Sequence, residues 1–288
     1  MFVTHAVLLL LALFVGAGAA QPTVEPTFLH RHVPDVPAAE SEQGTPGCRY
    51  RPVFGAGDAE SRIAKGVARF GEIVVEPGAA CRPVRHAREE QVYVVLQGTG
   101  QLKYGAQDVR ITRHDFMYLA PTMEHTLSNP SAEPNRILVM GFRLPDSMAL
   151  RIPDRLLIAN IDEVPLQVVG NHPPSTLYRL LMGGVESTRD RIAAGHVLTS
   201  LFIMEFTPGG TNQPHHHERE EEIYLLLEGE GDMVAGGGMG GVEGRHPARA
   251  GDAFFFRLNC TVGFYASPRD AQGKARILAV RSLFPFSR

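Results

Sequence analysis

The sequence has 288 residues, of which 44% are apolar and 20% charged, and its formal net charge is −3 with the 12 histidines counted as neutral. This composition is typical of a globular protein and excludes a disordered chain, while the length allows two domains of ordinary size or one large one. The lack of a basic excess argues against a nucleic-acid partner, and 30 glycines with 21 prolines favour many short strands over long helices.

The chain begins with a candidate signal peptide. Residues 6–20 read AVLLLLALFVGAGAA, an apolar run too short to span a bilayer comfortably, and its small final residues suit cleavage after Ala19 or Ala20. The alternatives are a buried N-terminal helix and an uncleaved anchor, because no Lys or Arg precedes the run. We expect residues 1–20 to be removed, leaving a secreted or periplasmic protein with no membrane contact.

Residues 21–47 carry five prolines and little periodicity, which predicts an extended arm or linker. His30 and His32 form a His-x-His pair on this arm. Because the sequence offers no third ligand nearby, we interpret them as surface histidines.

Three cysteines follow the apolar run: Cys48, Cys81 and Cys260. An oxidising compartment permits one disulfide, and the pair Cys48–Cys81 closes the shorter loop. The odd number leaves at least one thiol free or paired between chains. The alternative is that all three are small buried apolar side chains.

An internal repeat divides the chain. A shift of 131 positions aligns residues 77–100 with 208–231, and eleven of the 24 aligned residues are identical. A second block, 114–125, aligns with 251–262 at a shift of 137, and the Gly-rich turn 236–241 accounts for the six extra residues. We therefore predict a tandem duplication with domains at 48–150 and 151–288.

Both halves read as short strands. The runs QVYVVLQG and EIYLLLEG are aliphatic or β-branched and end in Gly, and similar runs recur between Pro, Gly and Asn. Only the range 179–194 is a candidate for a short helix. The sequence predicts an all-β protein in which each half is a sandwich or barrel.

The motif PHHHEREEEIYLLLEGEG resembles the first motif of the cupin family, with His215, His217, Glu222 and Gly229 at the motif positions. In the first half, PTMEH places His125 where the second cupin motif has its fourth ligand. The resemblance implies a double-cupin protein built of two tandem antiparallel jelly-roll barrels. It also implies that these side chains are metal ligands.

The residues themselves support a metal site in the second half. His215 and His217 project to the same face of a strand, and Glu222 on the next strand can face the same interior. Two imidazoles and one carboxylate suit a divalent transition metal such as Fe, Mn, Zn, Ni or Cu, with open positions for a substrate. The alternative is a surface or structural histidine cluster. In the acidic stretch 218–222 we expect a solvated turn, apart from Glu222, which is also the candidate catalytic residue.

The second half departs from the family pattern at its fourth ligand position, where Val262 aligns with His125. We expect a substrate rather than the protein to fill the open position, although His246 is a possible substitute ligand. Arg257 is the candidate substrate-binding residue if it faces the cavity, and otherwise a surface arginine.

The first half has lost different ligands. Val84 replaces the first His and Gln91 replaces the Glu, while His86 and His125 remain. These three polar residues are a candidate second site that either holds a metal or hydrogen-bonds a small ligand. We expect an asymmetric protein with its metal in the C-terminal barrel.

We expect a metal-dependent enzyme of dioxygenase, decarboxylase or hydrolase type that acts on a small oxyanion. The alternatives are a non-catalytic binding or storage protein and a structural homo-oligomer with vestigial sites. The intact His-x-His and Glu favour the enzyme, whereas the two incomplete ligand sets favour the alternatives. Family resemblance alone does not decide between them.

Overall fold

The computed structural model describes residues 26–237, 243–269 and 274–284. The predicted signal peptide and most of the Gly-rich turn lie outside these ranges. Within them the chain forms strands and three short 3-10 helices, and no helix is long and apolar enough to cross a membrane. The expected helix at 179–194 is wrong: this range contains the end of one strand and the start of another, because its apolar residues pack within a sheet.

The strands in chain order are β1 (Phe28–His32), β2 (Cys48–Gly55), β3 (Val67–Val75), β4 (Glu89–Gln97), β5 (Thr99–Tyr104), β6 (Gln107–Thr112), β7 (Asp115–Leu119), β8 (His125–Ser128), β9 (Asn135–Arg143), β10 (Leu157–Asn160), β11 (Thr176–Gly184), β12 (Ile192–Gly195), β13 (Leu198–Phe206), β14 (Glu220–Glu228), β15 (Glu230–Gly236), β16 (Gly244–Arg249), β17 (Asp252–Phe256), β18 (Thr261–Ala266) and β19 (Ala275–Leu283). The 3-10 helices are η1 (Val33–Asp35), η2 (Ser61–Ile63) and η3 (Ile161–Glu163).

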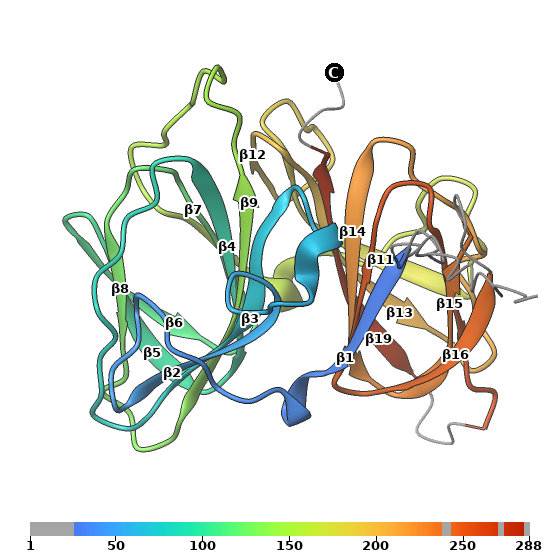
Figure 1. Cartoon of the computed structure of the whole chain (residues 1–288), viewed down its shortest axis with the longest axis horizontal. Coiled ribbons are helices and arrows are strands. Elements are labelled where there is room, and N and C mark those ends of the chain that lie inside the picture. The colour runs from blue at the N-terminus through green and yellow to red at the C-terminus, as the bar shows by residue number, and fades with distance from the viewer. Residues whose placement is uncertain (1–25, 238–242, 270–273, 285–288) are drawn as a thin grey trace, which may run out of the picture.

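The strands form two barrels that lie side by side (Figure 1). In the N-terminal barrel a six-stranded sheet, ordered β10-β7-β4-β9-β3-β2, faces the small sheet β6-β5-β8. The C-terminal barrel repeats this plan with β1-β17-β14-β19-β13-β11-β12 and β16-β15-β18. All neighbouring strands are antiparallel except β11 and β12. The prediction of an all-β chain with two tandem antiparallel barrels is confirmed.

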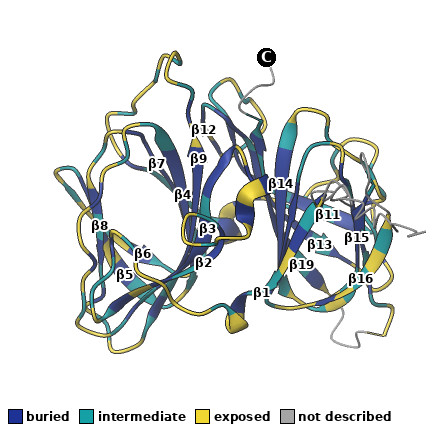
Figure 2. Ribbon diagram, viewed as in Figure 1, coloured by how far each residue is buried: buried dark blue, intermediate teal, exposed yellow. Residues whose placement is uncertain are grey.

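Each large sheet is buried on both faces, which explains the unbroken apolar runs of its central strands (Figure 2). In β4, Tyr93 and Val95 point into the barrel, while Val92 and Val94 belong to a third core between the two large sheets. β14 alternates in the same way. Because side chains alternate along a strand, one residue faces the barrel interior and the next faces the interface between the barrels.

The two halves exchange their first strands. β1, from the N-terminal arm, pairs with β17 of the C-terminal barrel, and β10, from the second half, pairs with β7 of the N-terminal barrel. Figure 1 shows β1 lying against the C-terminal barrel. The turns that follow are also equivalent, because Val33 N donates to Gly251 O and Ile161 N donates to His114 O. Part of the arm is thus an integral strand.

Cys48 and Cys81 form a disulfide that ties the start of β2 to the loop before β4. Cys260 is a buried free thiol.

Two buried carboxylates join the barrels. Glu90 of β4 accepts hydrogen bonds of 2.7 to 2.9 Å from the backbone N–H groups of residues 196–198 at the start of β13. Glu221 of β14 accepts bonds of 2.7 to 3.1 Å from residues 65–67 at the start of β3. Both pairs are related by the repeat shift of 131, and neither Glu is more than 1% exposed. The expectation of a solvated turn is therefore wrong for Glu221.

Replacing Glu221 with Ala leaves three backbone N–H groups without an acceptor inside the interface. Each unsatisfied buried group costs about 1–3 kcal/mol, and we expect the free energy of unfolding to fall by about 3 kcal/mol in all. Chemical denaturation followed by circular dichroism measures this loss. The exposed neighbour Glu218 is the control, and its replacement with Ala should change stability by less than about 0.5 kcal/mol. Equal effects at both positions would contradict the role of Glu221.

Candidate metal centre

The candidate metal centre lies inside the C-terminal barrel. His215 pairs with Val262 through two backbone hydrogen bonds of 2.8 and 2.9 Å, which fix the loop before β14 against β18. Glu222 lies on the interior face of β14, one residue after the interface carboxylate Glu221, and its backbone pairs with Phe256 and Arg281. Only Glu222 lies on a strand: His215 and His217 lie in the loop before β14, so the expectation that both histidines project from one strand is wrong.

The structure brings together the three predicted ligands. One donor atom from each of His215, His217 and Glu222 lies within 4.8 Å of the other two. His215 Nδ1 donates to the carbonyl of Gln213 at 2.9 Å, which leaves Nε2 as the free, unprotonated nitrogen. A backbone partner of this kind commonly orients a metal-binding imidazole.

The donor set fits a divalent cation. His217 Nε2 and Glu222 Oε2 lie 3.2 Å apart, and each is buried without a hydrogen-bond partner. The two atoms form an ion pair without hydrogen-bond geometry, so both remain available as ligands for a cation that would satisfy them more fully. Burial raises the pKa of Glu222, but His217, Arg281 and His215 outweigh it and hold that pKa below its ordinary value. Burial also lowers the pKa of His215, which keeps its imidazole neutral and able to bind a metal.

These donors line a small cavity of about 130 Å³. Two arginines, Arg189 and Arg281, reach it as well. Arg281 lies 3.9 Å from Glu222 and 3.4 Å from Glu220, and its Nε is buried without a hydrogen-bond partner. The remaining lining residues are Val169, His172, Tyr178, Leu180, Ser200, Phe202, Met204, Asn212 and Tyr224. The cavity therefore combines an apolar wall with cationic groups beside the candidate ligands.

Two sequence expectations fall elsewhere. Arg257 does not line the cavity, and its backbone N–H donates to Thr27 on the arm. His246 lies on β16, where its ring packs 4.8 Å from the ring of Phe28. The arginine that reaches the donors is Arg281, the second of two arginines in the otherwise apolar run ARILAVRSLF, and no sequence motif marks it.

A second overlooked residue is His172, in the loop before β11. Its Nδ1 donates to Asn212 O at 2.8 Å, and its ring lies 5.8 Å from the ring of His215. No motif marks His172, because its loop approaches the site only in the folded barrel.

The fourth family position is occupied by buried Val262 in the C-terminal barrel. The equivalent pair in the N-terminal barrel is Val84 and His125, which are bridged in the same way. Each barrel thus has one His and one Val across this bridge, but on opposite strands. The sequence alignment of Val262 with His125 holds in three dimensions.

In the N-terminal barrel, both ring nitrogens of His125 have protein partners. Gln43 donates to the Tyr93 hydroxyl at 3.0 Å, and that hydroxyl lies 3.1 Å from His125 Nε2. His125 Nδ1 lies 3.1 Å from Met123 O and must carry the proton there, because a carbonyl only accepts. Both nitrogens of His125 are therefore used without a metal.

The other two candidate residues of this barrel are also held by neighbours. Gln91 donates to Glu89 at 2.7 Å, and Glu89 is paired with Arg69 at 2.6 Å. His86 lies 3.5 Å from Glu42, a residue of the arm that also binds Arg69. The structure thus places His86, Gln91 and His125 in one barrel and gives each a protein partner, while His86 Nε2 and Gln91 Oε1 are buried without a hydrogen bond.

A family model for the cupin domain matches the sequence twice, over residues 71–141 and 202–272. The fold is similar to that of protein Ylba from E. coli, with 14% identity, a TM-score of 0.68, and 92% of this chain and 94% of that chain covered. It is also similar to an oxalate decarboxylase from Lactobacillus farciminis, with 13% identity, a TM-score of 0.64, and coverage of 89% and 86%.

A third similar structure is the 7S globulin of Momordica charantia, with 12% identity, a TM-score of 0.60, and coverage of 88% and 83%. At such identities these likenesses concern the fold alone. No curated protein matches the sequence.

The contrast between the barrels predicts a metal content of about one per chain. Replacing His217 with Ala removes one of three converging donors and should abolish most of this metal. Replacing His86 with Ala should leave it unchanged, because His86 faces Glu42 and Arg69. Elemental analysis of both purified variants measures the metal directly. Loss of metal in the His86 variant alone would reverse the assignment of the site.

Buried His125 predicts a pH-dependent stability. Burial lowers its pKa from 6.5 to about 4, so the unfolded chain takes up this proton first as the pH falls. The free energy of unfolding should decrease between about pH 6.5 and pH 4, by up to about 3 kcal/mol. His125→Gln should flatten this decrease, whereas the same change at exposed His216 should not. Denaturant titrations across this pH range test it, and an unaltered slope in His125→Gln would assign the effect to other groups.

Proposed function

The chain is a double-cupin protein, and from this premise we propose that its C-terminal barrel is a metal-dependent enzyme site for a small oxyanion. The proposal rests on one observation: His215, His217 and Glu222 converge in a cavity that Arg281 also lines. The metal would be Fe, Mn, Zn, Ni or Cu, all of which accept imidazole and carboxylate ligands. When bound, such an ion supplies Lewis-acid chemistry or, for Fe, Mn and Cu, redox chemistry.

The protein side chains bind and orient the substrate. Arg281 offers a planar pair of N–H donors that matches a carboxylate, and its charge attracts an anion into the cavity. The volume of about 130 Å³ limits the substrate to a small molecule. Apolar residues such as Phe202 and Leu180 restrict water beside the donors.

Glu220 acts as a positioning residue in this proposal. Its carboxylate lies 3.6 Å from His217 Nδ1 and 3.4 Å from the Arg281 guanidinium. It therefore orients a metal ligand and the substrate-binding arginine together. Glu222, the catalytic candidate of the sequence, serves in this arrangement as the carboxylate ligand.

Among dioxygenase, decarboxylase and hydrolase chemistry, we favour a decarboxylase-like reaction on a small carboxylate. The support is the fold shared with oxalate decarboxylases, which is an analogy at the level of the fold. The second candidate is a non-catalytic binding or storage protein. It is favoured by the existing ion pairs of Arg281, which partly occupy the group that a substrate would need.

We also propose that the mature protein works in an oxidising compartment, secreted or periplasmic. The Cys48–Cys81 disulfide supports this, because disulfides persist mainly outside the cytosol. Alkylation of free thiols before and after reduction, followed by mass spectrometry of protein taken from its native compartment, tests the pairing. We expect one free thiol before reduction, that of Cys260, and three free thiols there would contradict the proposal.

Oxalate is a suitable first probe of the site. With metal-loaded protein, Arg281→Gln should weaken oxalate binding about tenfold, the expected loss of one charge-assisted contact, while the metal content stays at one per chain. Arg257→Gln is the matched control and should bind oxalate as the wild type does, because Arg257 lies outside the cavity. Calorimetry measures binding, and release of carbon dioxide separates an enzyme from a binding protein. Equal losses in both variants would remove Arg281 from the site.

A further inference from the structure

A second cavity, of about 350 Å³, lies between the two barrels and apart from the candidate metal centre. The N-terminal barrel contributes residues of β3, β4 and β9, and the C-terminal barrel contributes residues of β14 and β19. The 3-10 helices η1 and η3 close it at Val33 and Ile161. Its volume falls within the range of small-molecule sites, about 300–1,000 Å³.

The cavity has an apolar floor. Leu96 and Leu227, which are equivalent in the repeat, are only half-buried and both line it. Val94, Leu138 and Leu225 also line the cavity. This surface suits an aliphatic or aromatic group, because each buried methylene contributes about 0.8 kcal/mol.

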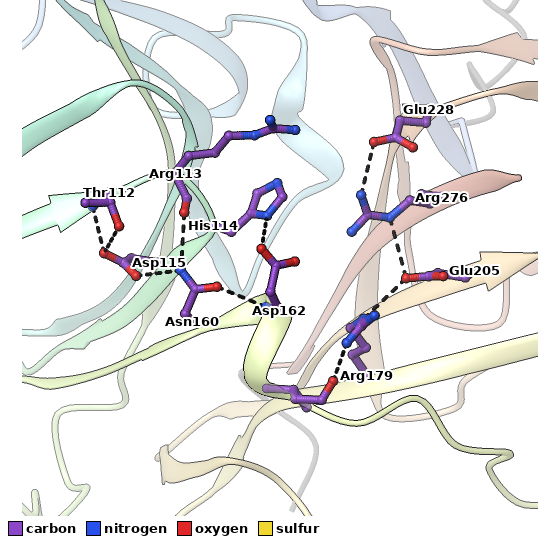
Figure 3. A network of polar contacts seen from close by, with 11 residues as sticks. Thr112, Arg113, His114, Asp115, Asn160, Asp162, Arg179, Glu205, Glu228 and Arg276 are labelled. Carbon is purple, nitrogen blue, oxygen red and sulfur yellow. Dashed lines mark hydrogen bonds and ion pairs between the residues drawn. The ribbon is translucent and has the colours of Figure 1, made fainter.

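The rim of the cavity is charged, and its charges are nearly balanced. Arg136 pairs with Glu72 at 2.6 Å, and Arg276 pairs with Glu228 at 3.0 Å. His114 bonds to Asp162 at 2.8 Å, as Figure 3 shows.

Arg113 is the exception. Among the described residues, no hydrogen-bond acceptor or carboxylate contacts its guanidinium, although its backbone carbonyl accepts from Asn160. In Figure 3 this guanidinium extends from the turn before β7, while the other labelled charges are joined by dashed lines. One uncompensated cation thus stands on the rim of an apolar cavity.

The repeat places no second cation opposite Arg113. At the shift of 137, Arg113 and His114 correspond to Ala250 and Gly251, which line the opposite side. A side chain at Gly251 is disfavoured, because its φ of +94° is left-handed and a Cβ there would lie 3.0 Å from His32. An otherwise symmetric cavity therefore has one cationic side and one small, uncharged side.

We infer that this cavity binds an amphipathic monoanion, with its carboxylate or similar head group on Arg113 and its apolar tail on the leucines of both barrels. Arg113 is exposed, and a neutral ligand would gain no charge-assisted contact with its guanidinium, whereas a short anion would leave the leucine floor uncovered. Neither the metal donors nor Arg281 line this cavity, so the site is separate from the proposed enzyme site.

Decanoate, titrated by isothermal calorimetry, is the probe. We expect one decanoate per chain, and Arg113→Gln should raise its Kd about tenfold, as for the loss of one charge-assisted contact. Arg110→Gln, at an exposed arginine outside the lining, is the matched control and should leave the Kd unchanged. Decanol should bind both proteins equally, and butanoate should bind far more weakly than decanoate.

Two further variants separate this site from others. Ala250→Trp fills the cavity from an exposed position and should abolish decanoate binding; it also adds the only Trp of the chain, whose emission reports folding. His217→Ala should bind decanoate as the wild type does. The inference is overturned if decanoate does not bind, if Arg113→Gln and Arg110→Gln behave alike, or if binding is lost in His217→Ala.

Discussion

The docking of the barrels depends on the reciprocal burial of Glu90 and Glu221. A carboxylate without water is costly, and each of these has three backbone N–H partners only when the other barrel is in place. Burial raises the pKa of Glu221, and the N–H groups of residues 65–67 counteract this effect. The same contacts fix β14, so Glu221 faces the interface while the next residue, Glu222, is held toward the metal donors. Interface and site are thus neighbouring positions of one strand.

The two barrels show how a duplicated site becomes two different ones. Arg69 on β3 pairs with Glu89 in the first barrel, whereas Ser200 has the equivalent place in the second and leaves room beside Arg281. In the first barrel Gly141 takes the place of Arg281, and a Cβ there would lie 2.0 Å from Glu89. Each barrel thus has an interior arginine, but on different strands of the repeat. In one barrel it closes the interior, and in the other it lines a cavity.

Local patterns of the sequence were sufficient for the repeat and the all-β fold. The spacing of the motif also predicted the convergence of His215, His217 and Glu222, although the two histidines lie in a loop fixed by the bridge to Val262 and not on a strand. Such patterns did not reveal the pairing of β1 with β17, since strand exchange depends on residues more than 200 positions apart. Arg281 and Glu221 escaped for a related reason. The sequence around a charged residue in a strand is the same whether its side chain faces solvent, a cavity or another domain.

Because of the strand exchange, neither half of the chain contains a complete barrel of its own. A cut in the segment 144–156 would yield two fragments, each carrying the strand that completes the sheet of the other. Such fragments are related as the subunits of a domain-swapped dimer with approximate two-fold symmetry. The linking segment then acts as a tether that raises the local concentration of one subunit around the other. A homodimer would have to lose or alter both copies of a site at once, whereas the tethered pair let its two copies evolve independently.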